Sequence, residues 1–492
     1  MTATNKDFPP EIVDNRTQVV QSEIIPVEIT TEHTNSLDIP AVIQNNQQTS
    51  RQDIQVAAES TVATIDLQSQ QQQGKQPELV ANASIASSSF NLINTILGAG
   101  ILTIPYCFSK TGWVVGIILQ VATALISHYT FTSLCTGSQM SNSFDYSTIV
   151  KNILGKYAGW YSTFSLLIFT AFVMVSFCII TRDNLIFIKQ DWAKMLVMWL
   201  VLLFMMMTLS LFKDINKLWI TSFLAVVCVS YIFVFLVVIS ILVRVTDLDL
   251  GFDLKPPIAF GRKILPYIQA LATYSLCFCG HFNTTNIYAE LKDRSPKKMN
   301  KVSAITAYSV LILNIGIGMG GYFIFTDTVA SDVLKSFESV PNANLKPWCI
   351  IAHLAIIIVM ICSYPLLCFC FRTTLNKIIF KNKVLGYKHQ VIVVVTASLI
   401  FCLVASFLND IGIVLDIASA IAGIPLVLVF PGFIQHKYQK RVYKEWDAER
   451  TKKQYRLLAA EGVFAFLVGC AGVIIVGVGI SGSVTSIMKV EE

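Results

Sequence analysis

Long apolar stretches separated by short polar ones fill this chain from about residue 85 onward. Each stretch has about 20 residues, the length that an α-helix needs to cross a bilayer. Their apolar residues do not alternate with polar ones as they do in strands. We therefore predict an all-α polytopic membrane protein. Eleven transmembrane helices are expected, at residues 87–108, 112–135, 160–181, 195–212, 218–243, 264–286, 301–326, 347–371, 390–408, 411–433 and 462–488.

The composition supports this prediction and argues against several classes of function. Hydrophobic residues make up 54% of the chain and charged residues 14%, whereas soluble domains carry about 25% charge. Most of the 12 cysteines lie inside apolar stretches, as small buried hydrophobes do, and they suggest neither disulfides nor a metal cluster. No phosphate loop and no catalytic set occurs. We expect neither an enzyme nor a nucleic-acid partner, and no cofactor besides a coupling ion.

Residues 1–84 form a different region, because they contain no spanning segment and include a glutamine-rich run at 68–73. Such a composition is typical of disorder. The region also lacks the basic and apolar parts of a signal peptide. We predict a disordered cytosolic N-terminal tail, either passive or regulatory, followed by a transporter domain at 85–492.

The basic residues orient the segments. Loops expected on the side of the tail carry 22 of the 37 Lys and Arg residues, and the opposite side carries 11. This bias predicts a cytosolic N-terminus and an extracellular or lumenal C-terminus. A plasma membrane and a lysosomal or vacuolar membrane both suit this topology, and we expect a monomer in the lipid bilayer.

The first segment contains a weak point at mid-membrane depth. Its sequence from residue 91 to 113 is NLINTILGAGILTIPYCFSKTGW, with Gly98, Ala99 and Gly100 in the middle and Pro105 soon after. Glycine and proline weaken a helix, and an interrupted backbone in lipid must be buried in protein or line a cavity. Polar side chains share one helical face with Gly98, namely Ser87, Asn91 and Asn94.

The sixth segment repeats this pattern. Gly280 lies next to His281 and Asn283, and Thr273 and Cys277 share its helical face. Interrupted helices at matching positions of two five-helix blocks indicate a transporter built from inverted repeats. Half-helix N-termini hold a carboxylate in such a site, and freed carbonyls hold an ammonium or Na⁺. The alternative is that these glycines only allow close helix packing.

Several motifs resemble the amino acid/auxin permease family, in particular its sodium-coupled neutral amino acid transporters and vacuolar amino acid transporters. The first-segment sequence above, GHFNTTNIYAELKD at 280–293, PKKMNKV at 296–302, CSYPLLCFCFR at 362–372 and NDIGIVLDIASAIAGIPLVLVFPG at 409–432 occur in the family's order. The resemblance covers about residues 85 to 490. Asn286 departs from it, since the family commonly has proline there.

The resemblance implies an eleven-helix, leucine-transporter-like fold, a 5+5 inverted repeat plus one helix with helices 1 and 6 broken. It implies that amino acids move by alternating access. The implied substrate site is the backbone from Gly98 to Ile101, with the sixth segment opposite. The candidate substrate residues are Thr95, Gly98, Ala99, Gly100, Ile101, Cys277, Gly280 and Asn283. The resemblance places a Na⁺ site at Asn94 and Ser363, with carbonyls near Leu97.

Other ionisable residues in the membrane segments have less defined roles. His281 either carries a coupling proton or is a neutral histidine that closes the helix break. We expect His128 and His353 to be interfacial or structural. Asp416 is a candidate gate or helix cap, and Asp410 a helix cap. The basic stretch at 437–456 predicts a cytosolic amphipathic helix near anionic headgroups.

Two functions follow from these observations. The first is a secondary active transporter of neutral amino acids coupled to Na⁺ or H⁺, because no strong charge lies in the first broken helix. The second is an amino acid sensor that signals through its cytosolic tail. The sequence leaves the ion, the membrane and the particular amino acid open.

Overall fold

The computed structural model describes residues 81–211, 215–246, 250, 255–261, 264–380, 387–408, 415, 418–444 and 452–488. The chain divides into two units, Met1–Pro77 and Glu78–Glu492. Most of the predicted tail, together with Asp410 and Asp416, lies outside the described residues.

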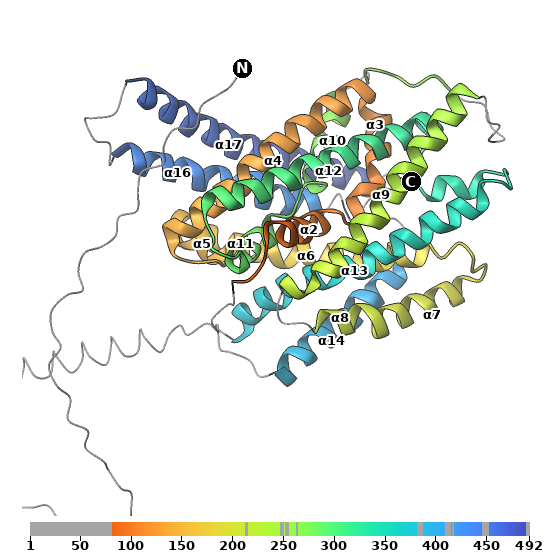
Figure 1. The fold of residues 1–492 in the computed structure, drawn as a ribbon, viewed down its shortest axis with the longest axis horizontal. Helices are drawn as coiled ribbons and strands as arrows, with labels where there is room; N and C mark the ends of the chain where they lie inside the picture. Colours follow the sequence, from red (N-terminus) through yellow and green to blue (C-terminus); the bar gives the residue numbers. More distant parts are fainter. Residues whose placement is uncertain are drawn as a thin grey trace, which may run out of the picture. The chain divides into compact units, whose positions relative to one another are not determined.

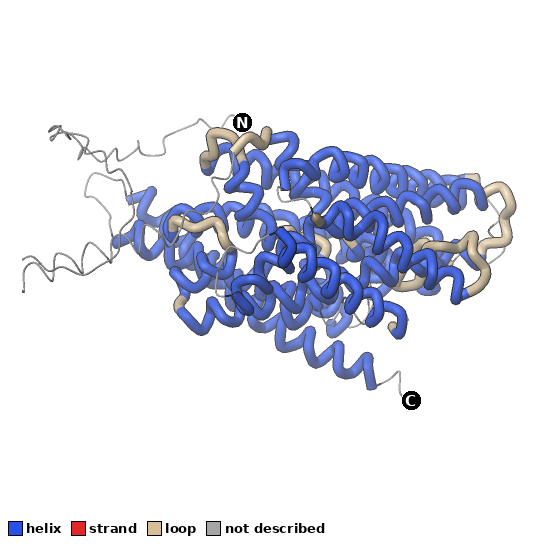
Figure 2. The backbone as a smooth tube through the Cα atoms, turned by 90° about the horizontal axis from the view of Figure 1, so that it is seen from below, coloured by secondary structure: helices blue, strands red, loops and turns tan. Residues whose placement is uncertain are grey.

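The described part of the chain is helical, with one isolated bridge between Ala83 and Leu291. Figure 2 shows helices almost throughout, with loops mainly near the ends of the long helices. In chain order the helices are α2 (Ile85–Ile96), η1 (Ala99–Thr103), α3 (Ile104–Thr111), α4 (Trp113–Ser141), α5 (Tyr146–Leu154), α6 (Lys156–Asp183), α7 (Asp191–Val201), η2 (Leu202–Met206), α8 (Met207–Ser210), η3 (Ile215–Leu218), α9 (Trp219–Val245), α10 (Ile264–Leu276), α11 (His281–Glu290), α12 (Pro296–Phe325), η4 (Thr326–Thr328), η5 (Lys335–Ser339), α13 (Lys346–Phe380), α14 (Tyr387–Phe407), η6 (Ser419–Gly423), η7 (Pro425–Val429), α16 (Phe430–Lys444) and α17 (Lys452–Met488).

Among the described residues, nine helices are long and apolar enough to cross a membrane. A tenth span is obtained if the pair Ile85–Ile96 and Gly100–Thr111, bent by 55°, counts as one. The predicted sixth segment forms α10 and α11, whose 13 and 10 residues are each too short to span alone. The predicted number of eleven therefore stays a prediction.

Two local features differ from the sequence prediction. Residues 146–154 form a short helix, α5, whose N-terminus is capped by the Asp145 carboxylate through the Thr148 N–H at 2.8 Å. The stretch 437–456, predicted as one amphipathic helix, is divided in the structure: its first part belongs to α16, its last part begins α17, and residues 445–451 lie outside the described residues. Both helices simply extend beyond the apolar residues that define their spans.

The helix with the first break lies inside the bundle. α2 packs against α9, α11, α12 and α13, and α12 in turn packs against α4 and α9. Figure 1 shows α2 and α11 near the middle of the ribbon, with the longer helices around them. Nine residues of α2 are buried, including Asn91 and Asn94. The polar face predicted from the sequence is therefore directed into protein, where its side chains need partners.

Candidate functional site

The two helix breaks lie in direct contact. The Cys277 Sγ donates to the Gly100 carbonyl oxygen at 3.2 Å, and the Thr103 hydroxyl donates to the same oxygen at 2.7 Å. A Cβ atom added at Gly100 would lie 2.9 Å from the Cys277 Sγ, closer than real Cβ contacts allow. Glycine at position 100 is therefore required by the close approach of the sixth segment.

Gly280, at the second break, is packed in the same way against α2. A Cβ atom there would lie 2.8 Å from the Ile96 side chain and 3.0 Å from Leu92. Gly280 precedes the first residue of α11, so the helix N-terminus begins beside the end of α2. The positive end of α11 thus lies near the negative end of α2, an arrangement suited to a zwitterion.

A small cavity of about 20 Å³ lies between the two breaks and α6. Such a space holds about one water molecule. Its lining is mostly apolar and includes no charged residue. The lining residues are Thr95, Ile96, Gly98, Gly100, Phe169, Val173, Phe177, Leu276, Cys279, Phe282, Leu367 and Leu415. Three of the candidate substrate residues, Thr95, Gly98 and Gly100, are among them.

Asn283 and Thr95 connect the two broken segments beside this cavity. The Asn283 amide donates to the Leu366 carbonyl at 3.1 Å and to the Thr95 hydroxyl at 3.5 Å. Among the described residues, the buried Asn283 Oδ1 has no hydrogen-bond partner. A buried acceptor without a partner is costly, so Asn283 is suited to receive an N–H donor from a ligand.

The remaining backbone candidates, Leu97, Ala99 and Ile101, follow the end of α2. The Leu97 N–H donates to Ile93 at 2.8 Å and the Ile101 N–H to Gly98 at 3.3 Å. Regular helix hydrogen bonding therefore stops at Leu97 and resumes as the tighter η1 at Ala99. Carbonyls in the last turn of a helix have lost their partners along the chain and are available to a cation.

The two residues proposed for Na⁺ are joined directly. The Ser363 hydroxyl donates to Asn94 Oδ1 at 2.6 Å, and both side chains are buried. The Asn94 amide donates to the Ser222 hydroxyl at 3.1 Å and to the Cys362 carbonyl at 3.2 Å. This cluster of Asn94, Ser222, Cys362 and Ser363, here called the Asn94 cluster, gathers four oxygens from three helices, the ligand type that hard cations prefer.

Sequence reasoning missed Ser222. It lies in α9, in an apolar stretch where several other serines have the same local surroundings. Only the packing of α9 against α2 singles it out.

His281 is not among the residues that line the cavity. Its Nε2 lies 2.7 Å from the Thr130 hydroxyl, and its ring stacks on Phe131 with centroids 4.2 Å apart. Both partners belong to α4. His281 therefore ties the first turn of α11 to α4, as one of the two predicted alternatives, a histidine that closes the break, would do.

At one end of the bundle the residues before α2 pair with the end of the sixth segment. We call this end of the bundle the Ser141 end, because α4 ends there. Ala83 pairs with Leu291 as in a parallel strand: the Ala83 N–H donates to the Glu290 carbonyl and the Lys292 N–H donates to the Ala83 carbonyl, both at 2.9 Å. This pairing, the Ala83 closure, holds the start of the first broken segment to the end of the sixth. Ala83 falls within the range predicted as tail.

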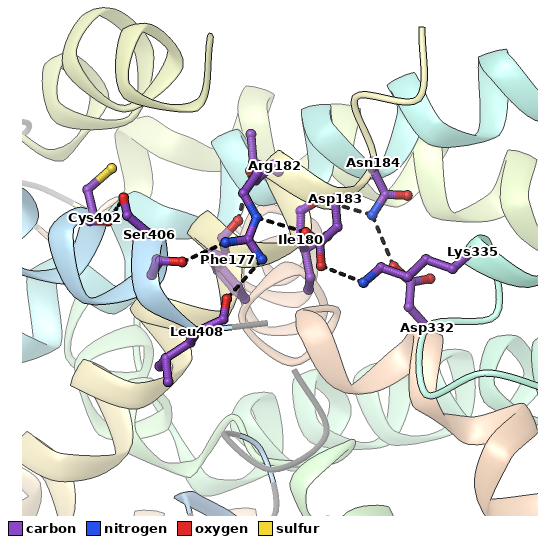
Figure 3. Close-up of polar contacts among 12 residues, drawn as sticks. Phe177, Ile180, Arg182, Asp183, Asn184, Asp332, Lys335, Cys402, Ser406 and Leu408 are labelled. Carbon is purple, nitrogen blue, oxygen red and sulfur yellow. Dashed lines mark hydrogen bonds and ion pairs between the residues drawn. The ribbon is translucent and has the colours of Figure 1, made fainter. Parts of the chain in front are cut away.

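At the opposite end, where α6 finishes at Asp183, the loop between α12 and α13 contacts the first break. The Val333 N–H donates to the Leu102 carbonyl in η1 at 3.2 Å, so this loop lies directly on the first break. Charged residues fix it to α6. The Lys335 Nζ lies 2.6 Å from Asp183 Oδ2, and the Arg182 Nε donates to Asp183 Oδ1 at 2.9 Å (Figure 3).

A second set of contacts continues this closure inside the protein. The Asn184 amide donates to Asp332 Oδ2 at 3.0 Å, and Asn184 Oδ1 lies 2.7 Å from His353 Nδ1. His353 is on α13 and is 1% exposed, which agrees with a structural role. Burial raises the pKa of the Asp332 carboxyl to about 6, although the Asn184 amide and the Leu334 N–H partly oppose this. We call Arg182, Asp183, Asn184, Asp332, Lys335 and His353 the Asp332 network.

Comparison with known proteins places this site in a family. A family model described as "Transmembrane amino acid transporter protein" matches residues 81–475. The sodium-coupled neutral amino acid symporter 2 of Danio rerio is 23% identical over 73% of this chain and 76% of its own. The vacuolar amino acid transporter 2 of Saccharomyces cerevisiae is 24% identical over 71% of this chain and 76% of its own.

Among solved structures, a Na⁺-coupled sialic acid symporter in a substrate-bound outward-open state is similar, with a TM-score of 0.48 and 12% identity. The match covers 81% of this chain and 91% of that chain.

The family model covers both helix breaks, the Asn94 cluster and both closures, and the sequence resemblance is thereby confirmed. The family consists of transporters and not of enzymes. This chain therefore belongs to the transmembrane amino acid transporters, the amino acid/auxin permease family.

Proposed function

We propose that this protein is a secondary active transporter that moves neutral amino acids across a membrane by alternating access. The observation that carries the proposal is the contact between Gly100 and Cys277, which joins two interrupted helices around an apolar cavity without charged lining. Interrupted helices in lipid persist where they serve a binding site. The names of the relatives, which include neutral amino acid symporters, support the same substrate class.

The charged ends of an amino acid fit the ends of the broken helices. Its carboxylate is stabilised by the N–H groups at the start of α11 or η1, and its ammonium by carbonyls at the end of α2 and by Asn283 Oδ1. Its side chain lies against Phe169, Phe177 and neighbouring apolar residues. A charged side chain has no partner there and is disfavoured.

Transport requires that the cavity expand and that the two ends open in turn. In the structure both the Ala83 closure and the Asp332 network are formed, and the cavity is too small for an amino acid. This arrangement supports a closed intermediate of a leucine-transporter-like cycle with eleven helices. Breaking the Ala83 closure would open the Ser141 end, which we place in the cytosol.

Na⁺ is the favoured coupling ion. The Asn94 cluster supplies oxygen ligands next to the first break, whereas His281, the alternative proton carrier, faces α4. The relatives include a sodium-coupled symporter and a vacuolar transporter, so the plasma membrane and a vacuolar or lysosomal membrane are both retained.

The test is uptake of a mixed panel of labelled amino acids into proteoliposomes, with the Na⁺ and pH gradients varied separately. We expect saturable uptake of neutral amino acids driven by the Na⁺ gradient. If no amino acid shows saturable, gradient-dependent uptake, the proposal is wrong. Uptake driven only by a pH gradient would support amino acid transport but exclude Na⁺ as the coupling ion.

A second function, an amino acid sensor, is favoured by one observation. Ala83, which lies at the end of the region predicted as the signalling tail, takes part in the closure of the Ser141 end. Deletion of residues 1–80 leaves Ala83 and the Ser84 cap of α2 in place. Unchanged uptake with loss of a downstream response would support the sensor, and an unchanged response would reject it.

A further inference from the structure

A second pocket, unrelated to the central cavity, lies at the Ser141 end and has a volume of about 400 Å³. It is formed where the ends of α4 and α5 meet the last turns of α16, and Figure 1 shows α5 and α16 at the same end of the ribbon. Three of its seven lining residues are the cations Lys437, Lys440 and Arg441, and none of the seven is acidic. Its size is that of a small-ligand site.

The three cations are brought together by the fold. They are spaced i, i+3 and i+4 in α16, so they share one helical face, where like charges repel. The Lys437 Nζ donates to the Ile153 carbonyl, in the last turn of α5, at 2.7 Å. This contact fixes one side of the cationic face against the neighbouring helix.

The three cations suit an anionic ligand. A phosphate group carries a charge of about −1 to −2. Lys as a point charge and Arg as a planar fork are the side chains that bind phosphate oxygens.

We propose that this pocket binds the phosphate of an anionic phospholipid headgroup. The candidate spans Trp113–Ser141 and Ser419–Val442 both end at the pocket, which places it at headgroup level. Tyr157 and Trp160, 90% and 63% exposed, begin α6 directly after α5. Exposed aromatic residues of this kind mark the membrane interface. In the orientation proposed above, the pocket faces the cytosolic leaflet, which is rich in anionic lipids.

The proposal is tested by titrating the purified full-length protein, in a neutral detergent, with dioctanoyl phosphatidylinositol 4-phosphate. We expect the double variant Lys440→Ala/Arg441→Ala to bind it roughly thirtyfold more weakly. The matched control is Lys297→Ala/Lys301→Ala, which removes two exposed cations four residues apart on α12 at the same end, and we expect it to bind as the wild type does.

A second variant tests the pocket independently, in case the first variant misfolds. Asn152→Glu adds a negative charge at an exposed lining residue while all three cations remain, and it should also weaken binding. Equal losses in the pocket and control variants, or equally tight binding of dioctanoyl phosphatidylcholine, would overturn the site. If soluble inositol 1,4-bisphosphate bound as tightly as the lipid, the ligand would be a free phosphate and the lipid assignment would be rejected. The assay contains no amino acid and no ion gradient, so its outcome is independent of the transport test.

Discussion

The Cys277 Sγ lies 3.2 Å from the Gly100 carbonyl oxygen, and this contact joins the two interrupted helices of the protein. It leaves no room for a side chain at position 100, where a Cβ atom would lie 2.9 Å from the sulfur. A movement that enlarges the central cavity by separating the two broken segments therefore changes the distance between these two residues.

Substitution of Gly100 by valine should abolish uptake without preventing membrane insertion, because the added atoms collide with Cys277. Gly100→Ala should reduce uptake less than valine does, since overpacking typically costs about 1–3 kcal/mol. Adding Cys277→Ala to the Gly100→Ala variant should partly restore uptake. Gly477→Ala is the control, because a Cβ atom there meets nothing within 4 Å. Proteoliposome uptake at matched protein amounts measures all of them. Additive losses in the double variant would contradict a direct contact.

The Asn94 cluster predicts a change in ion dependence. Ser222→Ala or Ser363→Ala removes one hydrogen-bond partner of Asn94 and should raise the Na⁺ concentration for half-maximal uptake about tenfold, which corresponds to about 1.4 kcal/mol. Ser230→Ala, on the same helix as Ser222, removes only a bond to the Val226 carbonyl and should have no effect. An unchanged Na⁺ dependence in both cluster variants would place the ion elsewhere.

Asp332 predicts a pH-dependent stability. Its pKa is about 6 in the folded protein and about 3.9 in an unfolded chain. Between these values the folded state holds a proton that the unfolded state lacks, so stability increases as the pH falls from about 6 to about 4. The full gain is about 3 kcal/mol.

The variant Asp332→Asn cannot be charged, and its melting temperature should lack the increase that the wild type shows between pH 7 and pH 5. Asp327→Asn is the control, because Asp327 forms an exposed ion pair with Lys255 that contributes little. The same pH response in wild type and Asp332→Asn would assign the titration to another group.

The Ala83 closure predicts a variant that favours opening of the Ser141 end. Ala83→Pro removes the N–H that donates to Glu290, a bond whose net value is about 1 kcal/mol and which would shift the equilibrium about fivefold. The rate at which a thiol reagent modifies Cys279, which lines the central cavity, should rise in a background without the other cysteines. The control Asn82→Pro leaves the two hydrogen bonds of Ala83 in place, so its Cys279 should be modified slowly. Equal modification rates in the Ala83→Pro and Asn82→Pro variants would refute the closure.

The positions of the breaks could be predicted because a glycine beside polar residues weakens a helix locally. Gly98 and Gly280 lie between helices, whereas Gly318 lies inside the continuous α12, so glycine alone does not interrupt a helix. The resemblance to a family named Asn94 and Ser363, which the structure brings into contact. Ser222 and Asp332 could not be predicted, because their roles depend on which distant helix packs beside them. The helix α11 also continues through Asn286, at the position where the family commonly has proline.

The pairing of Ala83 with Leu291 has a consequence that reaches beyond the membrane domain. Consider a cytosolic protein that binds the residues before Ala83 more tightly when this pairing is broken. Its binding would shift the equilibrium between the paired and the broken state toward the open Ser141 end. Thermodynamic linkage requires the converse with the same factor, so substrate or ion that stabilises the paired state would release that protein. If such a protein exists, its release would report the occupancy of the site without its entering the transport path.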